Sequence, residues 1–305
     1  MAKYKIIINP VSGKGTGKDH IPEIERVLKE LGLDYDLVTT ERIGHAVELT
    51  QEAVMAGYDV VVAGGGDGTS NEVINGLMRA KAAGQGTAAM GVISIGRGND
   101  FAFSMGLPTG WETGVRLLAK ANKRLIDVGW LKGGDYPDGR FFGNGVGIGF
   151  DAVVGFVSAK YKRLSGFASY IVAALQSIFV YYKAPLLKIE YDDQVITQDS
   201  LMVSVMNGRR LGGGFMLAPN GKADDNLFDL NIVRQVDKLQ MIILLVRYIQ
   251  GKQAGHPAVK TCLGHKVTVT ALKASIQAHA DGETICTEGQ QLSMETLPCQ
   301  LELIC

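Results

Sequence analysis

The chain has 305 residues, of which 46% are hydrophobic and 20% charged, so it holds enough apolar material for two folded domains. Glycine is in excess, with 39 residues, whereas proline is scarce, with 8; this excludes a collagen-like or low-complexity chain and places the glycines in loops of folded domains. Lys and Arg (31) balance Asp and Glu (31). Because its net charge is zero, the protein as a whole is not attracted to nucleic acid or to an anionic bilayer. Any anionic ligand must therefore be bound by a local group of residues.

The first 132 residues alternate strand-like apolar runs with helical patterns. The expected strands are Tyr4–Asn9, Tyr35–Thr39, Asp59–Ala63, Met90–Ile95 and Arg124–Leu131. The expected helices are Ile21–Leu31, Ala46–Ala56, Asn71–Lys81 and Trp111–Lys120. This alternation predicts an α/β domain over residues 1–132 with a parallel sheet and helices on both faces. Ligands of such sheets bind at the carboxyl ends of the strands.

Residues 133–305 open with a turn-rich connector and then show strands separated by turns, which predicts a second, β-rich antiparallel domain. Its expected strands are Phe141–Ile148, Leu186–Tyr191, Ser200–Met206, Phe228–Val233, Lys266–Ala271 and Ser275–Ala280. Its expected helices are Ser165–Tyr182 and Lys238–Gln250. The last strand is compatible with a return to the first domain, and a β-rich domain is compatible with a homodimer.

One stretch, residues 164–182, has no formal charge over 19 residues, close to the ~20 that span a bilayer. Its apolar positions recur at spacings of three and four, which favours a core helix over membrane contact and membrane contact over a true span. The cysteines show no metal or disulfide spacing, and no secretory leader pattern begins the chain. We therefore expect a cytoplasmic protein.

Glycine loops follow three of the expected parallel strands. The first loop, residues 9–17, contains Lys14 directly before a helix start and suits phosphate, although its spacing is not that of a Walker A loop. The second, residues 64–69, has three consecutive glycines before Asp67 and Thr69. A carboxylate beside phosphate is costly unless a cation bridges the two, so Asp67 implies Mg²⁺. The third, residues 96–102, repeats the design, and together the loops predict one composite phosphate site.

These motifs, in this order, resemble the diacylglycerol kinase catalytic-domain family, which includes sphingosine kinases and soluble bacterial lipid kinases. The resemblance covers essentially the whole chain. Its motifs are Asn9–Lys14, Thr40-Glu41, Gly65–Val73, Gly96–Ala102, Ile126–Gly129, Ala218–Asn226 and Asp281–Glu283. It implies an NAD kinase- or phosphofructokinase-like first domain, an antiparallel second domain, and an active site in the cleft between them.

The resemblance also implies roles for single residues. The ATP site would be lined by Asn9, Lys14, Thr40, Gly65, Gly66, Asp67, Gly68, Thr69, Ser70, Asn71, Glu72 and Arg97. A structural Mg²⁺ would be held by the carbonyls of Lys222 and Leu227 and by the Asp225 carboxylate. The general base would be Glu283 first and Asp67 second. Phosphoryl transfer to an alcohol needs these parts: a positioned γ-phosphate, neutralised charge and a carboxylate for the hydroxyl proton.

Two positions depart from the family pattern. Arg97 stands where a threonine is usual, and arginine can still bind phosphate with its fork of donors. Asn226 replaces a glycine, and asparagine tolerates the left-handed conformation of such a turn.

The implied function is an ATP-dependent lipid kinase acting on a lipid hydroxyl, first of all that of diacylglycerol, giving phosphatidic acid. Such an enzyme needs transient peripheral contact with the inner face of the membrane. Candidate basic residues for this contact are Lys160, Lys162, Arg163, Lys183, Arg209 and Arg210. Two alternatives remain: an NAD kinase-like enzyme, which shares the second glycine loop, and an inactive nucleotide- or lipid-binding regulator.

Overall fold

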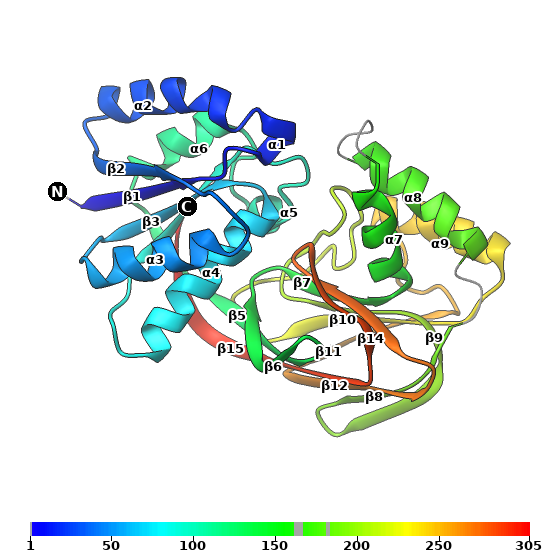
Figure 1. The fold of residues 1–305 in the computed structure, drawn as a ribbon. Helices are drawn as coiled ribbons and strands as arrows, with labels where there is room; N and C mark the ends of the chain where they lie inside the picture. Colours follow the sequence, from blue (N-terminus) through cyan, green and yellow to red (C-terminus); the bar gives the residue numbers. More distant parts are fainter. Residues whose placement is uncertain (1, 162–166, 181–183) are drawn as a thin grey trace. The chain divides into compact units, whose positions relative to one another are not determined.

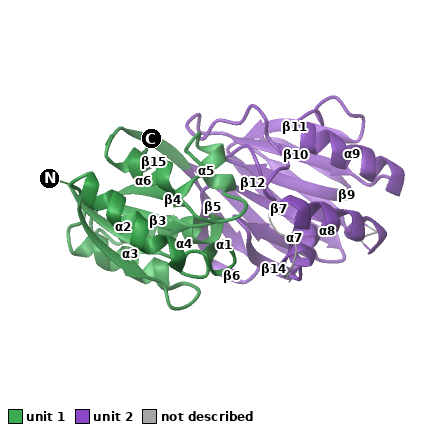
Figure 2. Cartoon of the chain, turned by 90° about the horizontal axis from the view of Figure 1, so that it is seen from above, with its two compact units in different colours: residues 1–127, 298–305 green, residues 128–297 purple. Residues whose placement is uncertain are grey.

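The computed structural model describes residues 2–161, 167–180 and 184–305. The chain divides into two compact units (Figure 2): unit 1 comprises residues 1–127 and 298–305, and unit 2 comprises residues 128–297. The sequence-based division after residue 132 falls inside strand β5 (Lys123–Gly133), which runs unbroken from unit 1 into unit 2. Strand β15 (Gln291–Ile304) begins in unit 2 and ends in unit 1.

Unit 1 is a parallel sheet in the order β4-β3-β1-β2, with the end of β15 beside β4. Its other strands are β1 (Lys3–Ile8), β2 (Asp34–Thr39), β3 (Val60–Gly65) and β4 (Ala89–Ser94). Its helices are α1 (Ser12–Gly15), η1 (Lys18–His20), α2 (Ile21–Glu30), α3 (His45–Met55), α4 (Asp67–Ala82), α5 (Asp100–Ser104) and α6 (Trp111–Leu118). Figure 1 shows α2 and α6 on one face of the sheet and α3 and α4 on the other.

The central strands of unit 1 are apolar because both faces of the sheet are covered. Every residue of β3 and β4 is buried, as expected for parallel strands beneath two helical layers. Helix α2 buries Ile24, Val27 and Leu28, which recur at spacings of three and four, against the same core as Ile6. The predicted α/β fold of the first domain is confirmed.

Unit 2 is built on antiparallel strands, as predicted. They are β6 (Tyr136–Phe142), β7 (Gly145–Gly149), β8 (Leu186–Tyr191), β9 (Gln194–Met206), β10 (Phe228–Arg234), β11 (Val259–Gly264), β12 (Lys266–Lys273), β13 (Ile276–Ala280) and β14 (Glu283–Gly289). The helices are α7 (Phe150–Ala159), α8 (Phe167–Val180) and α9 (Lys238–Gln250). Within the core of unit 2 the buried rings of Phe142 and Phe228 stack, with centroids 5.5 Å apart.

The sequence-based prediction of one strand at Phe141–Ile148 is wrong. The strand is interrupted at Gly143 and Asn144, between β6 and β7. The interruption arises because the N–H groups of Gly143, Asn144 and Gly145 donate hydrogen bonds to the buried carboxylate of Asp281, over 2.7, 3.0 and 2.9 Å. The elements that the sequence analysis did not expect include helix α7 and strands β11 and β14. The expected ends of the helix at Ser165 and Tyr182 lie outside the described residues. Among the described helices none is long and apolar enough to span a membrane.

Candidate active site

The three predicted glycine loops meet in unit 1, at the carboxyl ends of β1, β3 and β4. The N–H of Asn9 donates to the carbonyl of Gly64 over 2.8 Å, which joins the first loop to the second. The N–H groups of Ile95 and Gly96 both donate to the carbonyl of Gly65, at 2.8 and 3.0 Å, which joins the second loop to the third. The structure therefore brings together the residues that the sequence predicts for one composite site.

Close backbone approach explains why these loops contain glycine. A Cβ on Gly96 would lie 2.8 Å from Asn99 Oδ1 and 3.1 Å from the nitrogen of Gly66, with the Cα of Gly66 nearer still. A Cβ on Gly65 would lie 3.1 Å from Ser12 Oγ. Side chains at either position would push the loops apart, so the glycines are required by packing as well as by any ligand.

Asp67 begins helix α4 at the centre of this cluster. Its Oδ1 accepts a hydrogen bond from the N–H of Phe101 over 2.9 Å, at the start of the short helix α5. Its Oδ2 faces Gly98, where a Cβ would lie 2.9 Å away. The carboxylate of the second loop thus fastens the third loop, a structural role that sequence analysis missed because the Phe101 partner is a backbone group.

The first loop presents a cation on a strained backbone. Gly13 and Lys14 both adopt positive φ, at 62° and 70°, and a non-glycine residue in this region is uncommon outside functional or tightly constrained sites. The side chain of Asn9 accepts from the N–H of Val11 at 3.1 Å and donates to Thr69 Oγ1 at 3.3 Å. Lys14 and Arg97 are both exposed in their loops, as groups that bind a charged solute must be.

The remaining predicted nucleotide residues lie next to the loops, and some make structural contacts. Thr40 is buried at the end of β2 and its N–H donates to the carbonyl of Ile8 over 2.9 Å. Glu72 accepts from the N–H groups of Gly44 and Ala46, at 2.9 and 3.0 Å, and so caps the start of α3. Asn71 is buried and its side-chain oxygen accepts from Asn75. Gly68 and Ser70 lie in the first turn of α4. The nucleotide contacts of all these residues stay predictions.

The predicted metal turn lies in unit 2, directly before β10. Asn226 takes φ 60° there, which confirms the expected left-handed turn. Asp225 is exposed, and its Oδ1 accepts from the N–H of Leu227 at 3.2 Å. Burial, together with repulsion from Asp225, raises the pKa of Asp229 to about 6.

The residues of this turn carry the type of oxygen donor that Mg²⁺ prefers. In the described ranges no three His, Cys, Asp or Glu side chains are grouped closely enough to hold a metal by themselves. Mg²⁺ is commonly bound by one or two carboxylates with water completing the shell. The Asp225 carboxylate and the carbonyls of Lys222 and Leu227 are oxygen donors of this kind, and their binding of Mg²⁺ stays a prediction.

The two acids of the Asp281–Glu283 segment have different environments. Asp281 is buried at φ 49°, and besides its three backbone donors its own N–H donates to the carbonyl of Gly145 over 3.0 Å. Glu283 is half-buried at the start of β14. The turn at Gly282 therefore holds one carboxylate inside the fold and leaves the other partly accessible to solvent.

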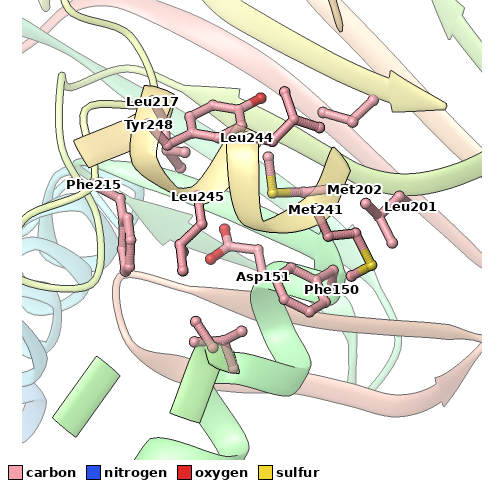
Figure 3. Close-up of a pocket in the computed structure, with 13 residues that line it drawn as sticks. Phe150, Asp151, Leu201, Met202, Phe215, Leu217, Met241, Leu244, Leu245 and Tyr248 are labelled. Carbon is pink, nitrogen blue, oxygen red and sulfur yellow. The ribbon is translucent and has the colours of Figure 1, made fainter. Parts of the chain in front are cut away.

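A small apolar cavity lies within unit 2, and Figure 3 shows its lining. Helices α7, α8 and α9 contribute Phe150, Ala174 and Leu244 among others, and the free space is about 50 Å³. The carboxylate of Asp151 points into this apolar environment, and His279 Nε2 lies 3.4 Å from its Oδ2. Burial raises the pKa of the Tyr248 hydroxyl in the same wall. Sequence analysis missed the pairing of Asp151 with His279 because the two residues are far apart in the chain.

A parallel α/β unit with three glycine loops, followed by an antiparallel β unit, defines a kinase fold of the NAD kinase-like class. Solved structures agree with this class. A diacylglycerol kinase structure from Bacillus anthracis superposes with a TM-score of 0.74 at 22% identity, covering 99% of this chain and 96% of the other. An NAD kinase from Archaeoglobus fulgidus, solved in complex with ATP, gives a TM-score of 0.54 at 15% identity and covers 100% and 94%. These likenesses concern the fold.

Sequence comparison is more specific. Residues 3–131 match the family described as diacylglycerol kinase catalytic domain, and residues 144–305 match the YegS C-terminal NAD kinase beta sandwich-like domain. Diacylglycerol kinases of Staphylococcus saprophyticus and Staphylococcus aureus are each 28% identical over 282 residues, covering 92% of this chain and 88% and 86% of the relatives. The chain belongs to the diacylglycerol kinase catalytic-domain family, and it is a kinase of that family.

Proposed function

We propose that this kinase transfers the γ-phosphate of ATP to a lipid hydroxyl, with diacylglycerol as the first candidate and phosphatidic acid as its product. The observation that carries the proposal is the joining of three glycine loops around Asp67 at the carboxyl ends of β1, β3 and β4. Backbone N–H groups, helix starts and the exposed cations Lys14 and Arg97 suit a polyphosphate. The relatives named diacylglycerol kinase support the lipid acceptor.

The proposed reaction is a single displacement at phosphorus. The lipid hydroxyl oxygen forms a bond to the γ-phosphorus, and the bond from that phosphorus to the bridging oxygen of ADP breaks. The hydroxyl proton passes to a carboxylate, which we assign first to Glu283 and second to Asp67. The Asp225 carboxylate and the carbonyls of Lys222 and Leu227 would hold Mg²⁺, which would supply positive charge at that turn.

The apolar cavity of unit 2 supports a lipid acceptor by its lining, but it is small. Its free volume of about 50 Å³ is far below the ~300 Å³ or more of ordinary ligand pockets, so an acyl chain would have to open it. Asp151 and Tyr248 place polar groups in the apolar wall, where a glycerol hydroxyl could find a partner. We also propose peripheral contact with the cytoplasmic face of the membrane, where this substrate resides.

The test is transfer of labelled γ-phosphate from ATP to a lipid panel in mixed micelles with Mg²⁺. We expect wild type to label diacylglycerol most strongly, and the Asp67→Asn and Glu283→Gln variants to lose about 10²-fold or more in kcat. Asp34→Asn and Glu288→Gln are matched controls, since both acids are exposed in the same units, and both should retain turnover.

Three outcomes would redirect the proposal. Labelling of NAD in place of lipid would favour the NAD kinase-like alternative. Binding of ATP without any transfer would favour an inactive regulator. Near-normal turnover of Glu283→Gln beside an inactive Asp67→Asn would move the general base to Asp67. Asparagine is used at position 67 because it keeps an oxygen for the Phe101 N–H, whereas alanine would also release the third loop.

A further inference from the structure

Helix α9 is apolar on two opposite faces. Its inner face buries Met241, Leu244 and Tyr248 in the core of unit 2. Its outer face leaves large aliphatic side chains in solvent at spacings of three and four, and Leu239 is 66% exposed. The outer aliphatic residues are Leu239, Ile242, Ile243 and Val246. A surface helix of a protein that only needs to fold has one such face, so the second face requires another partner.

Helix α8 has the same property and meets α9 at one end. It buries Ala173, Ala174, Ser177 and Ile178. Its exposed apolar residues are Val172, Leu175, Phe179 and Val180. The ammonium of Lys238, the first residue of α9, lies 5.1 Å above the ring of Phe179, and both helices pack on one hydrophobic cluster. We call these four side chains and the four outer ones of α9 the α8–α9 face.

The charged side chains of the two helices themselves have one sign. Neither helix contains an Asp or a Glu, whereas Lys238, Arg247 and Lys252 lie on or directly after α9. The adjacent acid, Asp237, caps the helix by accepting from the N–H of Gln240 over 2.9 Å. Beside α9 a groove of about 490 Å³ is lined by Arg234, Arg247, Ile243 and His256. Apolar side chains are thus bordered by basic groups.

We propose that the α8–α9 face docks on a lipid bilayer that contains anionic phospholipids, with its aliphatic side chains and Phe179 entering the headgroup boundary and the basic residues contacting phosphates. Helices that lie in the membrane interface combine these two features. A second copy of the chain fits less well, because a twofold interface pairs a surface with itself, and the two helices carry no Asp or Glu to pair with their basic side chains.

This inference deepens the proposed function and rests on it for the identity of the lipid substrate. Ala174 of α8 and Met241, Leu244 and Leu245 of α9 also line the apolar cavity beside Asp151. The helices that dock on the bilayer therefore also form the cavity wall. Movement of either helix on docking would change the width of the cavity that an acyl chain must enter.

The experiment measures binding of the full chain to vesicles by sedimentation, with phosphatidylcholine vesicles and with vesicles that also contain phosphatidylglycerol. We expect wild type to bind the anionic vesicles and to be released by salt. Leu239→Asp and Phe179→Asp should each weaken this binding roughly tenfold or more, since each replaces an inserting apolar group by an anion. The Arg234→Gln/Lys252→Gln double variant should weaken it roughly tenfold at low salt. Leu272→Asp is the matched control, because Leu272 is 50% exposed in β12, and it should bind like wild type.

A parallel assay on a short-chain diacylglycerol dispersed below its micelle concentration separates docking from catalysis. Leu239→Asp should keep its turnover there while losing vesicle binding. Absence of wild-type vesicle binding, or equal losses in Leu239→Asp and Leu272→Asp, would overturn the docking proposal whatever the kinase activity. Vesicle binding without lipid phosphorylation by wild type would instead overturn the proposed function and leave the docking surface standing. A change of oligomeric state in Leu239→Asp with unchanged vesicle binding would assign the face to a homodimer.

Discussion

The Gly96→Ala substitution tests whether close contact between the second and third glycine loops is required for nucleotide binding. A methyl group at this position would lie 2.8 Å from Asn99 Oδ1, 3.1 Å from the nitrogen of Gly66 and closer still to its Cα. Carbon atoms in normal contact are about 3.5–4.0 Å apart, so one loop must move by about 1 Å. The φ of Gly96 is not among the positive values, so alanine adds steric conflict without backbone strain.

We expect Gly96→Ala to have a modest effect on stability and a larger effect on catalysis. Overpacking of this kind costs about 1–3 kcal/mol of unfolding free energy, which lowers the melting temperature by several degrees. A displacement of about 1 Å in a site that positions reacting groups can cost about 10²-fold in rate. We therefore expect a modest loss of stability and a much larger loss of ATP affinity and kcat/KM, measured by calorimetry and by the labelled-phosphate assay.

Gly84→Ala is the control for the loss of stability. Gly84 also lies in unit 1 and has open space around it, but its φ of +67° makes alanine strained, at about 1–2 kcal/mol. This variant should lose comparable stability and keep ATP binding. If Gly96→Ala binds ATP with wild-type affinity, or if Gly84→Ala loses affinity to the same degree, the contact between the loops is not what positions the nucleotide.

Three further predictions concern single side chains. Mg²⁺ should raise the melting temperature of wild type but not of Asp225→Asn, measured by thermal shift after chelation; equal stabilisation of both would remove Asp225 from the metal site. Tyr248→Phe should be neutral or stabilising by about 1 kcal/mol in denaturant unfolding, because the buried hydroxyl has no hydrogen-bond partner among the described residues; a loss above that size would reveal a partner. Arg97→Thr should change the apparent ATP affinity, and an unchanged value would show that the arginine points away from phosphate.

Helices and strands could be predicted from the sequence where the spacing of apolar residues matches the layers that cover them in the structure. Strand β8 (Leu186–Tyr191) and helix α9 (Lys238–Gln250) have the predicted bounds, since each has a single clear pattern bounded by turn residues. The expected strand at Phe141–Ile148 failed because its break is caused by Asp281, a residue far along the chain. Long-range polar contacts leave no periodic trace in the sequence.

The candidate site shows the same limit. The glycine loops and Asp67 could be identified from motifs, because glycine and a helix-starting acid have local reasons to follow a parallel strand. The hydrogen bond from the Phe101 N–H to Asp67 could not, since any residue has an N–H. Nor could the pairing of Asp151 with His279, which depends on the register between β7 and β13 and on Gly147 between the two side chains.

The acids of the Asp281–Glu283 segment illustrate how structure separates roles that a motif leaves together. Asp281 accepts hydrogen bonds from three backbone N–H groups in the interior of unit 2. Its carboxylate therefore stabilises the interruption between strands β6 and β7. Hydrogen bonds to a charged group are worth about 1.5–3 kcal/mol each. An asparagine there presents a donor to at least one N–H, so Asp281→Asn should cost about 3 kcal/mol of unfolding free energy.

Glu283→Gln should show the opposite pattern, with near-normal stability and a large loss of kcat, because this half-buried side chain is the proposed proton acceptor. Denaturant unfolding and phosphate transfer, measured on both variants, separate the two roles. If Asp281→Asn keeps wild-type stability but loses turnover, the buried carboxylate acts in the chemistry and its three backbone contacts are not what stabilises unit 2. If Glu283→Gln loses stability as well as turnover, its effect on kcat cannot be assigned to proton transfer.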